Sequence, residues 1–216
     1  YSSAASDVYK RQDGRYFIQA AAQLEGTTVE LMKMGEPGVP EMNAYIEEVL
    51  KEGETLGFDG RVVSVGEGEG YAAIAGKKNA KVNYQVDLID EIWEDRPVLS
   101  EEPAFNLDVK YAGETVASKL ARIREEMKEA GTNVHVVSTL DDICWTLNIR
   151  GNDIDFFPLV LSYGIITMDS FELYIDEKKL DDKLKAKLAK DGVNLHPYND
   201  IYEDVKKFGS DVVAMI

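Results

Sequence analysis

Hydrophobic residues in the second half of the chain recur at the spacing of an amphipathic helix. One stripe has successive spacings of four, three, four and three residues and consists of Val116, Leu120, Ile123, Met127 and Ala130. Thr115 precedes the stripe in the position of a helix N-cap, and Gly131 follows it in the position of a stop. Because this spacing puts every member on one face, it predicts a helix over residues 116–130.

The other apolar patterns of this half predict an α/β fold with a mixed sheet. Short apolar runs predict strands at residues 134–137, 159–167, 171–175 and 212–216. Residues 168–170 separate two of these runs so closely that we expect an antiparallel hairpin there. Helical spacing predicts three further helices, over residues 140–147, 180–191 and 201–208. Such an order of elements is typical of helices packed on a sheet.

Residues 13–98 also alternate between strand-like and helix-like patterns. An Asp13-Gly14 turn leads into the first of four expected strands, at residues 15–18, 29–34, 55–58 and 82–84. Pro40 stands at the favoured first position of a helix whose apolar face continues to Leu50. The glycine-rich run at residues 65–70 does not have the dinucleotide-binding spacing, so we expect a flexible loop there, before a helix over residues 71–77.

These patterns divide the chain into four parts. Residues 1–12 have no apolar periodicity and read as translated cloning or sequencing adapter, so we expect them to be non-native and to take no part in the fold. Residues 13–98 are the first expected domain, residues 99–103 a linker, and residues 104–216 the second domain. A strand predicted at the very last residues leads us to expect a chain that is cut at both ends, with a truncated first domain.

Charge and cysteine content narrow the classes of function. The formal net charge is −16, from 24 Lys and Arg against 40 Asp and Glu. This balance argues against binding to nucleic acid or to an anionic membrane surface, because both need cationic residues. Solubility is the simplest reason for the acidity. Cys144 is the single cysteine, so no internal disulfide can form, and a reducing, cytoplasmic setting is expected.

The residues that could carry chemistry do not complete a known arrangement. His135 and His196 are far apart and lack ligand spacing around them, so both are interpreted as structural. Cys144 lies among apolar residues and is expected in the core. Four acids, Asp141, Asp142, Asp153 and Asp155, could hold Mg²⁺ or exchange protons, as in a ribonuclease-H-type nuclease. The alternative is that the first two occupy a helix first turn and the other two pair with Arg150.

Residues 148–158, with the sequence NIRGNDIDFFP, form the most distinctive loop of the chain. The loop concentrates polar residues and a glycine between a predicted helix and an apolar strand. One interpretation is a shaped loop at the rim of a cleft, and the other is an internally hydrogen-bonded connector.

Several collinear stretches resemble the aminopeptidase P family (Xaa-Pro aminopeptidases) in its large three-domain form. They are DGRYFIQAAAQL, LMKMGEPGVP, DLIDEIWEDRP, STLDDICWTLNIRGNDIDFFPLVLSYGIIT and HPYNDI, spread over residues 13–216. Some positions depart from the family pattern. Arg11 and Gln12 stand where Trp-Thr is usual, which agrees with a junction after Gln12, and Gly164 replaces an alanine.

The resemblance implies two successive creatinase N-terminal-like (ribonuclease-H-like) domains with mixed β-sheets flanked by helices. A catalytic "pita-bread" domain follows them in the family and is expected to be absent from these residues. That domain holds two metal ions, usually manganese, through two Asp, one His and two Glu, so no catalytic or metal-binding residue is carried over. The family removes the first residue of proline-containing peptides when proline is second, and a homodimer is expected.

The resemblance also suggests where this chain meets a peptide. We expect Asn148, Arg150 and Asp153 to line the mouth of the peptide cleft in the complete enzyme. The alternative function is a non-catalytic creatinase-N-like binding module that recognises basic peptides or proteins, which the charge of −16 would suit.

Overall fold

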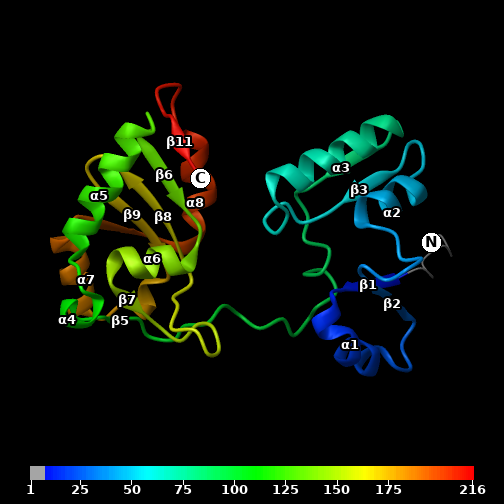
Figure 1. Cartoon of the computed structure of the whole chain (residues 1–216), viewed down its shortest axis with the longest axis horizontal. Coiled ribbons are helices and arrows are strands. Elements are labelled where there is room, and N and C mark those ends of the chain that lie inside the picture. Colours follow the sequence, from blue (N-terminus) through cyan, green and yellow to red (C-terminus); the bar gives the residue numbers. More distant parts are fainter. Residues whose placement is uncertain (1–7) are drawn as a thin grey trace. The chain divides into compact units, whose positions relative to one another are not determined.

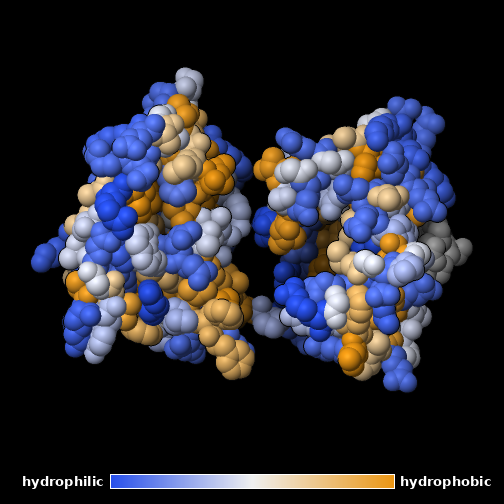
Figure 2. Space-filling view, in the orientation of Figure 1, coloured by the Kyte–Doolittle hydropathy of each residue, from blue (hydrophilic) through white to orange (hydrophobic). Residues whose placement is uncertain are grey.

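The computed structural model describes residues 8–216, and the chain divides into two compact units, Tyr1–Arg96 and Pro97–Ile216 (Figure 1). Each unit combines helices with parallel or mixed strand pairs, which confirms the predicted α/β class. Charged and polar residues cover most of the surface visible in Figure 2, with smaller apolar patches between them.

The first unit opens with a strand, a helix and a second strand. Its elements are β1 (Val8–Gln12), a 3₁₀ turn (Gly14–Tyr16), α1 (Phe17–Leu24) and β2 (Val29–Lys33), with β1 and β2 parallel. The strand predicted at residues 15–18 is therefore wrong. Asp13 accepts a hydrogen bond from the Arg15 backbone N–H and so starts a helical turn, and the alanines that follow favour helix over strand.

The expectation that residues 1–12 take no part in the fold is wrong for β1. This strand pairs with β2 over all five of its residues, from Val8 opposite Val29 to Gln12 opposite Lys33. Residues 1–7 lie outside the described residues. The adapter-like origin of the segment stays a prediction.

The rest of the first unit forms a second strand pair beneath two helices. Its elements are α2 (Met42–Val49), β3 (Thr55–Gly57), α3 (Val65–Lys77) and β4 (Lys81–Asn83), with β3 and β4 parallel. The core between them contains Ile46, Leu50, Ile74 and Ala75. The helix predicted after Pro40 and the strands near residues 29, 55 and 82 are confirmed, with ends shifted by one to two residues.

The glycine-rich run is helical, so the predicted flexible loop is wrong. The run forms the first part of α3, and the helix begins with a capping box. The Ser64 side chain accepts from the Glu67 backbone N–H, while the Glu67 carboxylate accepts from the Ser64 backbone N–H. This reciprocal cap satisfies two backbone N–H groups at a helix start and offsets the low helix propensity of glycine.

The second unit is built on a five-stranded mixed sheet with the order β10-β9-β8-β6-β11. Its strands are β6 (Val134–Val137), β8 (Ser162–Thr167), β9 (Phe171–Ile175), β10 (Val193–His196) and β11 (Ala214–Met215). β8 pairs antiparallel with both β6 and β9, which confirms the predicted hairpin. The edge strands β10 and β11 are parallel to their neighbours. A separate antiparallel pair joins β5 (Phe105–Asn106) to β7 (Ile149–Arg150).

Helices cover both faces of this sheet (Figure 1). The helices of this unit are α4 (Val109–Ala112), α5 (Val116–Glu129), α6 (Leu140–Leu147), α7 (Asp182–Lys190) and α8 (Ile201–Asp204), with 3₁₀ turns at Glu177–Lys179, Tyr198–Asp200 and Val205–Lys207. Successive strand residues face opposite sides: Phe171, Leu173 and Ile175 join the core shared with α5, α6 and α7. Tyr174 joins Ile201 of α8 in the core of the other face. The helix predicted over residues 116–130 is confirmed, including its Thr115 cap.

Candidate functional site

Asn148 ends helix α6 and ties three segments of the second unit together. Its backbone is left-handed, with φ of 52°, and its residue is 1% exposed. The side-chain oxygen accepts from Lys119 Nζ at 2.8 Å, and the side-chain amide donates to the Glu114 carbonyl oxygen at 2.9 Å. Asparagine suits this place because it tolerates the left-handed region and both ends of its amide find partners.

Lys119, on α5, is buried beside this corner. Its ammonium also donates to the Trp145 carbonyl oxygen and lies 4.2 Å from the centre of the Trp145 ring. Burial lowers the pKa of Lys119, while the Glu114 carboxylate acts in the opposite direction. The group is therefore held by two oxygen acceptors and an aromatic face, which compensates for much of its lost hydration.

Arg150 follows on β7 and is half-buried. Its guanidinium donates to the carbonyl oxygens of Cys144 and Ile149, each at 2.8 Å. The predicted pairing of Arg150 with Asp153 or Asp155 is thus wrong. These two backbone carbonyl oxygens, one in the last turn of α6 and one on β7, hold the guanidinium in place of the loop carboxylates. Cys144 itself is buried, as predicted, and burial raises the pKa of its thiol.

Asp153 instead forms a buried ion pair with Lys179. Asp153 Oδ2 lies 2.5 Å from Lys179 Nζ, and the side chains are 0% and 2% exposed. The same oxygen accepts from the Leu161 backbone N–H at 2.7 Å. The other oxygen, Oδ1, is buried and has no hydrogen-bond partner among the described residues. The loop is thereby fixed to the turn that follows β9.

A few residues after Asp153, the loop projects two aromatic side chains into solvent. Phe156 is fully exposed and has a positive φ of 69°, and Phe157 is 59% exposed. The loop is internally bonded: the Phe157 N–H donates to the Ile154 carbonyl oxygen, and the Gly151 N–H to that of Pro158. The interpretation as an internally hydrogen-bonded connector is therefore confirmed, and this connector also presents an exposed apolar tip, while the rim of a cleft stays a prediction.

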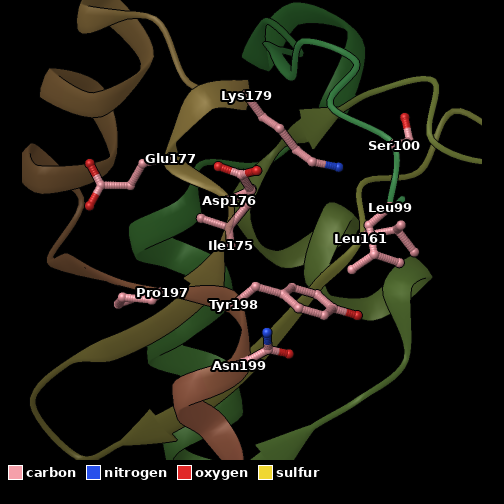
Figure 3. A pocket seen from close by; sticks show the side chains of 10 residues that line it. All are labelled: Leu99, Ser100, Leu161, Ile175, Asp176, Glu177, Lys179, Pro197, Tyr198 and Asn199. Atoms are coloured by element: carbon pink, nitrogen blue, oxygen red, sulfur yellow. The ribbon is translucent and has the colours of Figure 1, made fainter. Parts of the chain in front are cut away.

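Next to the ion pair lies a cavity of about 380 Å³, shown in Figure 3. Its apolar walls come from four segments and consist of Leu99, Leu161, Ile175, Pro197 and Tyr198. Its polar groups are Ser100, Asp176, Glu177, Lys179 and Asn199. In Figure 3 the Tyr198 ring points toward Leu99 and Leu161, and the carboxylate of Asp176 appears between Lys179 and Tyr198. All ten residues belong to the second unit.

Tyr198 is part of a tyrosine cluster at the edge of this cavity. Its ring lies 5.1 Å from that of Tyr163, whose hydroxyl is 3.0 Å from the Tyr202 hydroxyl. Burial raises the pKa of Tyr198, so the phenol is neutral at physiological pH and the wall it forms is uncharged.

The two histidines make structural contacts. The His135 ring lies 3.2 Å from the Met215 carbonyl oxygen, and His196 Nε2 lies 2.6 Å from Glu172 Oε2 while its ring stacks on Tyr174. Asp141 and Asp142 are in the first turn of α6, as predicted. Among residues 8–216 no group of three or more His, Cys, Asp or Glu side chains is arranged to hold a metal ion. In the same residues no helix is long and apolar enough to cross a bilayer.

The polar loop was predicted from the sequence, but the cavity was not. Asn148 and Asp153 could be named because the loop is polar and distinctive. Lys179 is 26 residues from Asp153 and belongs to a lysine-rich stretch that reads as a solvated surface. The stretch HPYNDI, which carried part of the family resemblance, contains Pro197, Tyr198 and Asn199. It was the sequence feature that could have indicated the cavity.

Comparisons with known proteins show which proteins the chain is similar to. A sequence profile described as the Creatinase/Prolidase N-terminal domain matches residues 95–215. The chain is 39% identical over 196 residues to aminopeptidase P2 of Arabidopsis thaliana, covering 89% of this chain and 28% of that protein. It is 37% identical over 191 residues to the Xaa-Pro aminopeptidase app-1 of Caenorhabditis elegans, covering 88% of this chain and 31% of that protein.

A solved structure agrees with these sequence relatives. It is the X-prolyl aminopeptidase of Caenorhabditis elegans, described as a cytosolic enzyme with a di-nuclear active site. The TM-score is 0.86 at 34% identity, over 93% of this chain and 33% of that one. The chain thus spans about a third of the length of the relatives it matches. With the profile covering more than half of its residues, the chain belongs to the creatinase/prolidase N-terminal domain family.

Proposed function

We propose that this chain is the amino-terminal, non-catalytic part of a metal-dependent Xaa-Pro aminopeptidase, which removes the first residue from peptides with proline in second place. The observation that carries the proposal is the match of 93% of the chain to one third of an X-prolyl aminopeptidase, with a TM-score of 0.86. The setting would be cytosolic, as described for that enzyme, and the complete protein would form a homodimer.

The metal chemistry belongs to other residues of the proposed enzyme. The relative has a di-nuclear active site, and two manganese ions are proposed here. The described residues do not fit such a site, because no cluster of three potential ligands occurs in residues 8–216. No catalytic step is therefore assigned to this chain, and its contribution is to shape and position the protein around the peptide.

Within that role, Asn148, Arg150 and Asp153 are proposed to form the mouth of the peptide cleft. Asn148 and Asp153 are buried, so their contribution is to hold the loop in place through Lys119 and Lys179. Arg150 is half-buried and is the cationic member of the three. The exposed Phe156 and Phe157 offer apolar surface on which a proline ring can pack.

Steady-state kinetics of the complete enzyme test this role. Replacing Arg150 by Ala should raise KM or lower kcat for an Xaa-Pro peptide. Arg124→Ala is the matched control, because Arg124 also donates to two backbone carbonyl oxygens, those of Thr167 and Ser170, but lies outside the loop. Unchanged kinetics in Arg150→Ala, with unchanged stability, would reject the role.

A second candidate function is a non-catalytic module that binds basic peptides or proteins. The net charge of −16 is the observation that favours it. Two assays on the complete protein distinguish the candidates. Release of the first residue from an Xaa-Pro peptide, abolished by a chelator, supports the peptidase. Salt-sensitive binding of a basic peptide without hydrolysis supports the module.

A further inference from the structure

The cavity beside the Asp153–Lys179 pair combines apolar walls with a carboxylate and a side-chain amide that can still bind a ligand. At about 380 Å³ it falls in the range of small-molecule sites and has room for about two residues of a peptide. Its polar groups determine which kind of ligand it can bind.

Asp176 supplies a carboxylate that lacks a cationic partner. It is half-buried, and its Oδ1 accepts a hydrogen bond from the Lys178 backbone N–H. The neighbouring charges are already paired: Lys179 with Asp153, Lys178 with Glu101 and Lys185 with Glu177. Asp176 is thus the one lining acid without an ion-pair partner among the described residues, and it favours a cation in the cavity.

A hydrogen-bond donor lines the same cavity, beside the Asp153–Lys179 pair, whose own side chains are closed to solvent. The Asn199 side-chain amide is exposed and has no partner among residues 8–216. Leu161 and Ile175 stand beside these groups, with the Tyr198 ring across from them (Figure 3). A matching ligand carries a cation, a carbonyl oxygen and an apolar group within a few atoms of one another.

We propose that this cavity binds the amino terminus of a peptide whose first side chain is apolar. The α-ammonium meets Asp176, the first carbonyl oxygen accepts from the Asn199 side-chain amide, and the side chain packs between Leu161 and Tyr198. An anionic ligand fits less well, because Asp176 and Glu177 both line the cavity. The inference does not rest on the peptidase function, since it uses contacts of the second unit alone.

The test is a titration of the full 216-residue chain with leucyl-alanine amide, followed by the amide resonances of Ser100, Asp176, Tyr198 and Asn199. A ligand of this size reaches a dissociation constant of about a millimolar. Acetylating the amino group of the peptide should weaken binding about tenfold or more, because it removes the charge. Equal binding of the acetylated peptide, or no saturable shift at these residues, would overturn the proposal.

Two variants locate the ligand. Asp176→Asn keeps the shape and the oxygen that accepts from Lys178, and should weaken binding about tenfold. Glu129→Gln makes the same change of charge at an exposed position on α5 outside the cavity and should change binding less than about twofold. Leu161→Ala should remove the preference for leucyl-alanine amide over glycyl-alanine amide. Undiminished binding in Asp176→Asn, or a preference retained in Leu161→Ala, contradicts the assignment.

Discussion

Lys179 Nζ and Asp153 Oδ2 lie 2.5 Å apart, and both side chains are shielded from water. The pair joins the turn after β9 to a loop 26 residues earlier in the chain. The other oxygen of Asp153, Oδ1, has no hydrogen-bond partner among the described residues, so Lys179 is the one cation that the structure gives this carboxylate. A buried ion pair of this kind fixes a geometry more than it adds net stability.

Lys179→Met should destabilise the second unit by about 3–5 kcal/mol, because it leaves a buried carboxylate without its cation. Urea unfolding in a Trp93→Phe background measures this, since Trp145 then reports on the second unit alone. Lys178→Met is the control: its pair with Glu101 is exposed, and its loss should cost less than about 1 kcal/mol. Adding Asp153→Leu to Lys179→Met should restore part of the loss, and a further loss would contradict a charge-based cause.

Gly164→Ala should also destabilise the second unit, by about 1–3 kcal/mol, because the added methyl overpacks the core. A Cβ on Gly164 would stand 2.6 Å from the Cζ atom of Phe171. Phe171→Leu shortens that side chain, so the double variant should be more stable than the sum of the two single changes predicts. Strict additivity in urea unfolding would show that the two positions do not meet.

Gly68→Ala should stabilise helix α3 by about 0.5–1 kcal/mol, because alanine favours helix and the new Cβ would make only an ordinary contact, 4.0 Å from Phe58. Gly68→Pro should destabilise it by about 3 kcal/mol, since the Gly68 N–H donates to the Ser64 carbonyl oxygen. Hydrogen exchange of the α3 amides measures both. A proline that is tolerated would mean that the run is a loop after all.

Glu114 makes the second unit sensitive to acid. Hydrogen bonds from Arg122 and Ser118 lower the pKa of Glu114 from 4.5 to about 2. The folded-state pKa is depressed, so the stabilisation is complete above pH 4.5 and is lost as the pH falls toward 2. Glu114→Gln lacks this stabilisation at every pH. Its stability deficit against the parent chain should therefore shrink on acidification through that window, and a constant deficit would contradict the assignment.

Local patterns predicted much of the second unit. The stripe on α5 and its Thr115 cap, strand β6, and the β8–β9 hairpin are each encoded within about 20 residues and were confirmed. The incorrect secondary-structure predictions have specific causes. The Ser64–Glu67 capping box was present in the sequence, but the three glycines at positions 66, 68 and 70 suggested a loop. The strand predicted at residues 15–18 gave too little weight to the alanines after it.

The candidate site could be predicted only in part, because its contacts are long-range. Asn148, Arg150 and Asp153 were named from one loop, while their partners are carbonyl oxygens and two lysines on other elements. No local spacing encodes a pair such as Asp153 and Lys179. The cavity is assembled from residues near positions 99, 161, 176 and 198, so its existence follows from the fold alone.

We infer that this chain is the non-catalytic amino-terminal part of a metal-dependent Xaa-Pro aminopeptidase. The most direct measurement is release of the first amino acid from an alanyl-proline peptide in the presence of manganese, by the purified 216-residue chain and by the complete protein that contains it. We expect release by the complete protein and none by the chain alone. Release by the chain alone, or none by the complete protein, would contradict this assignment.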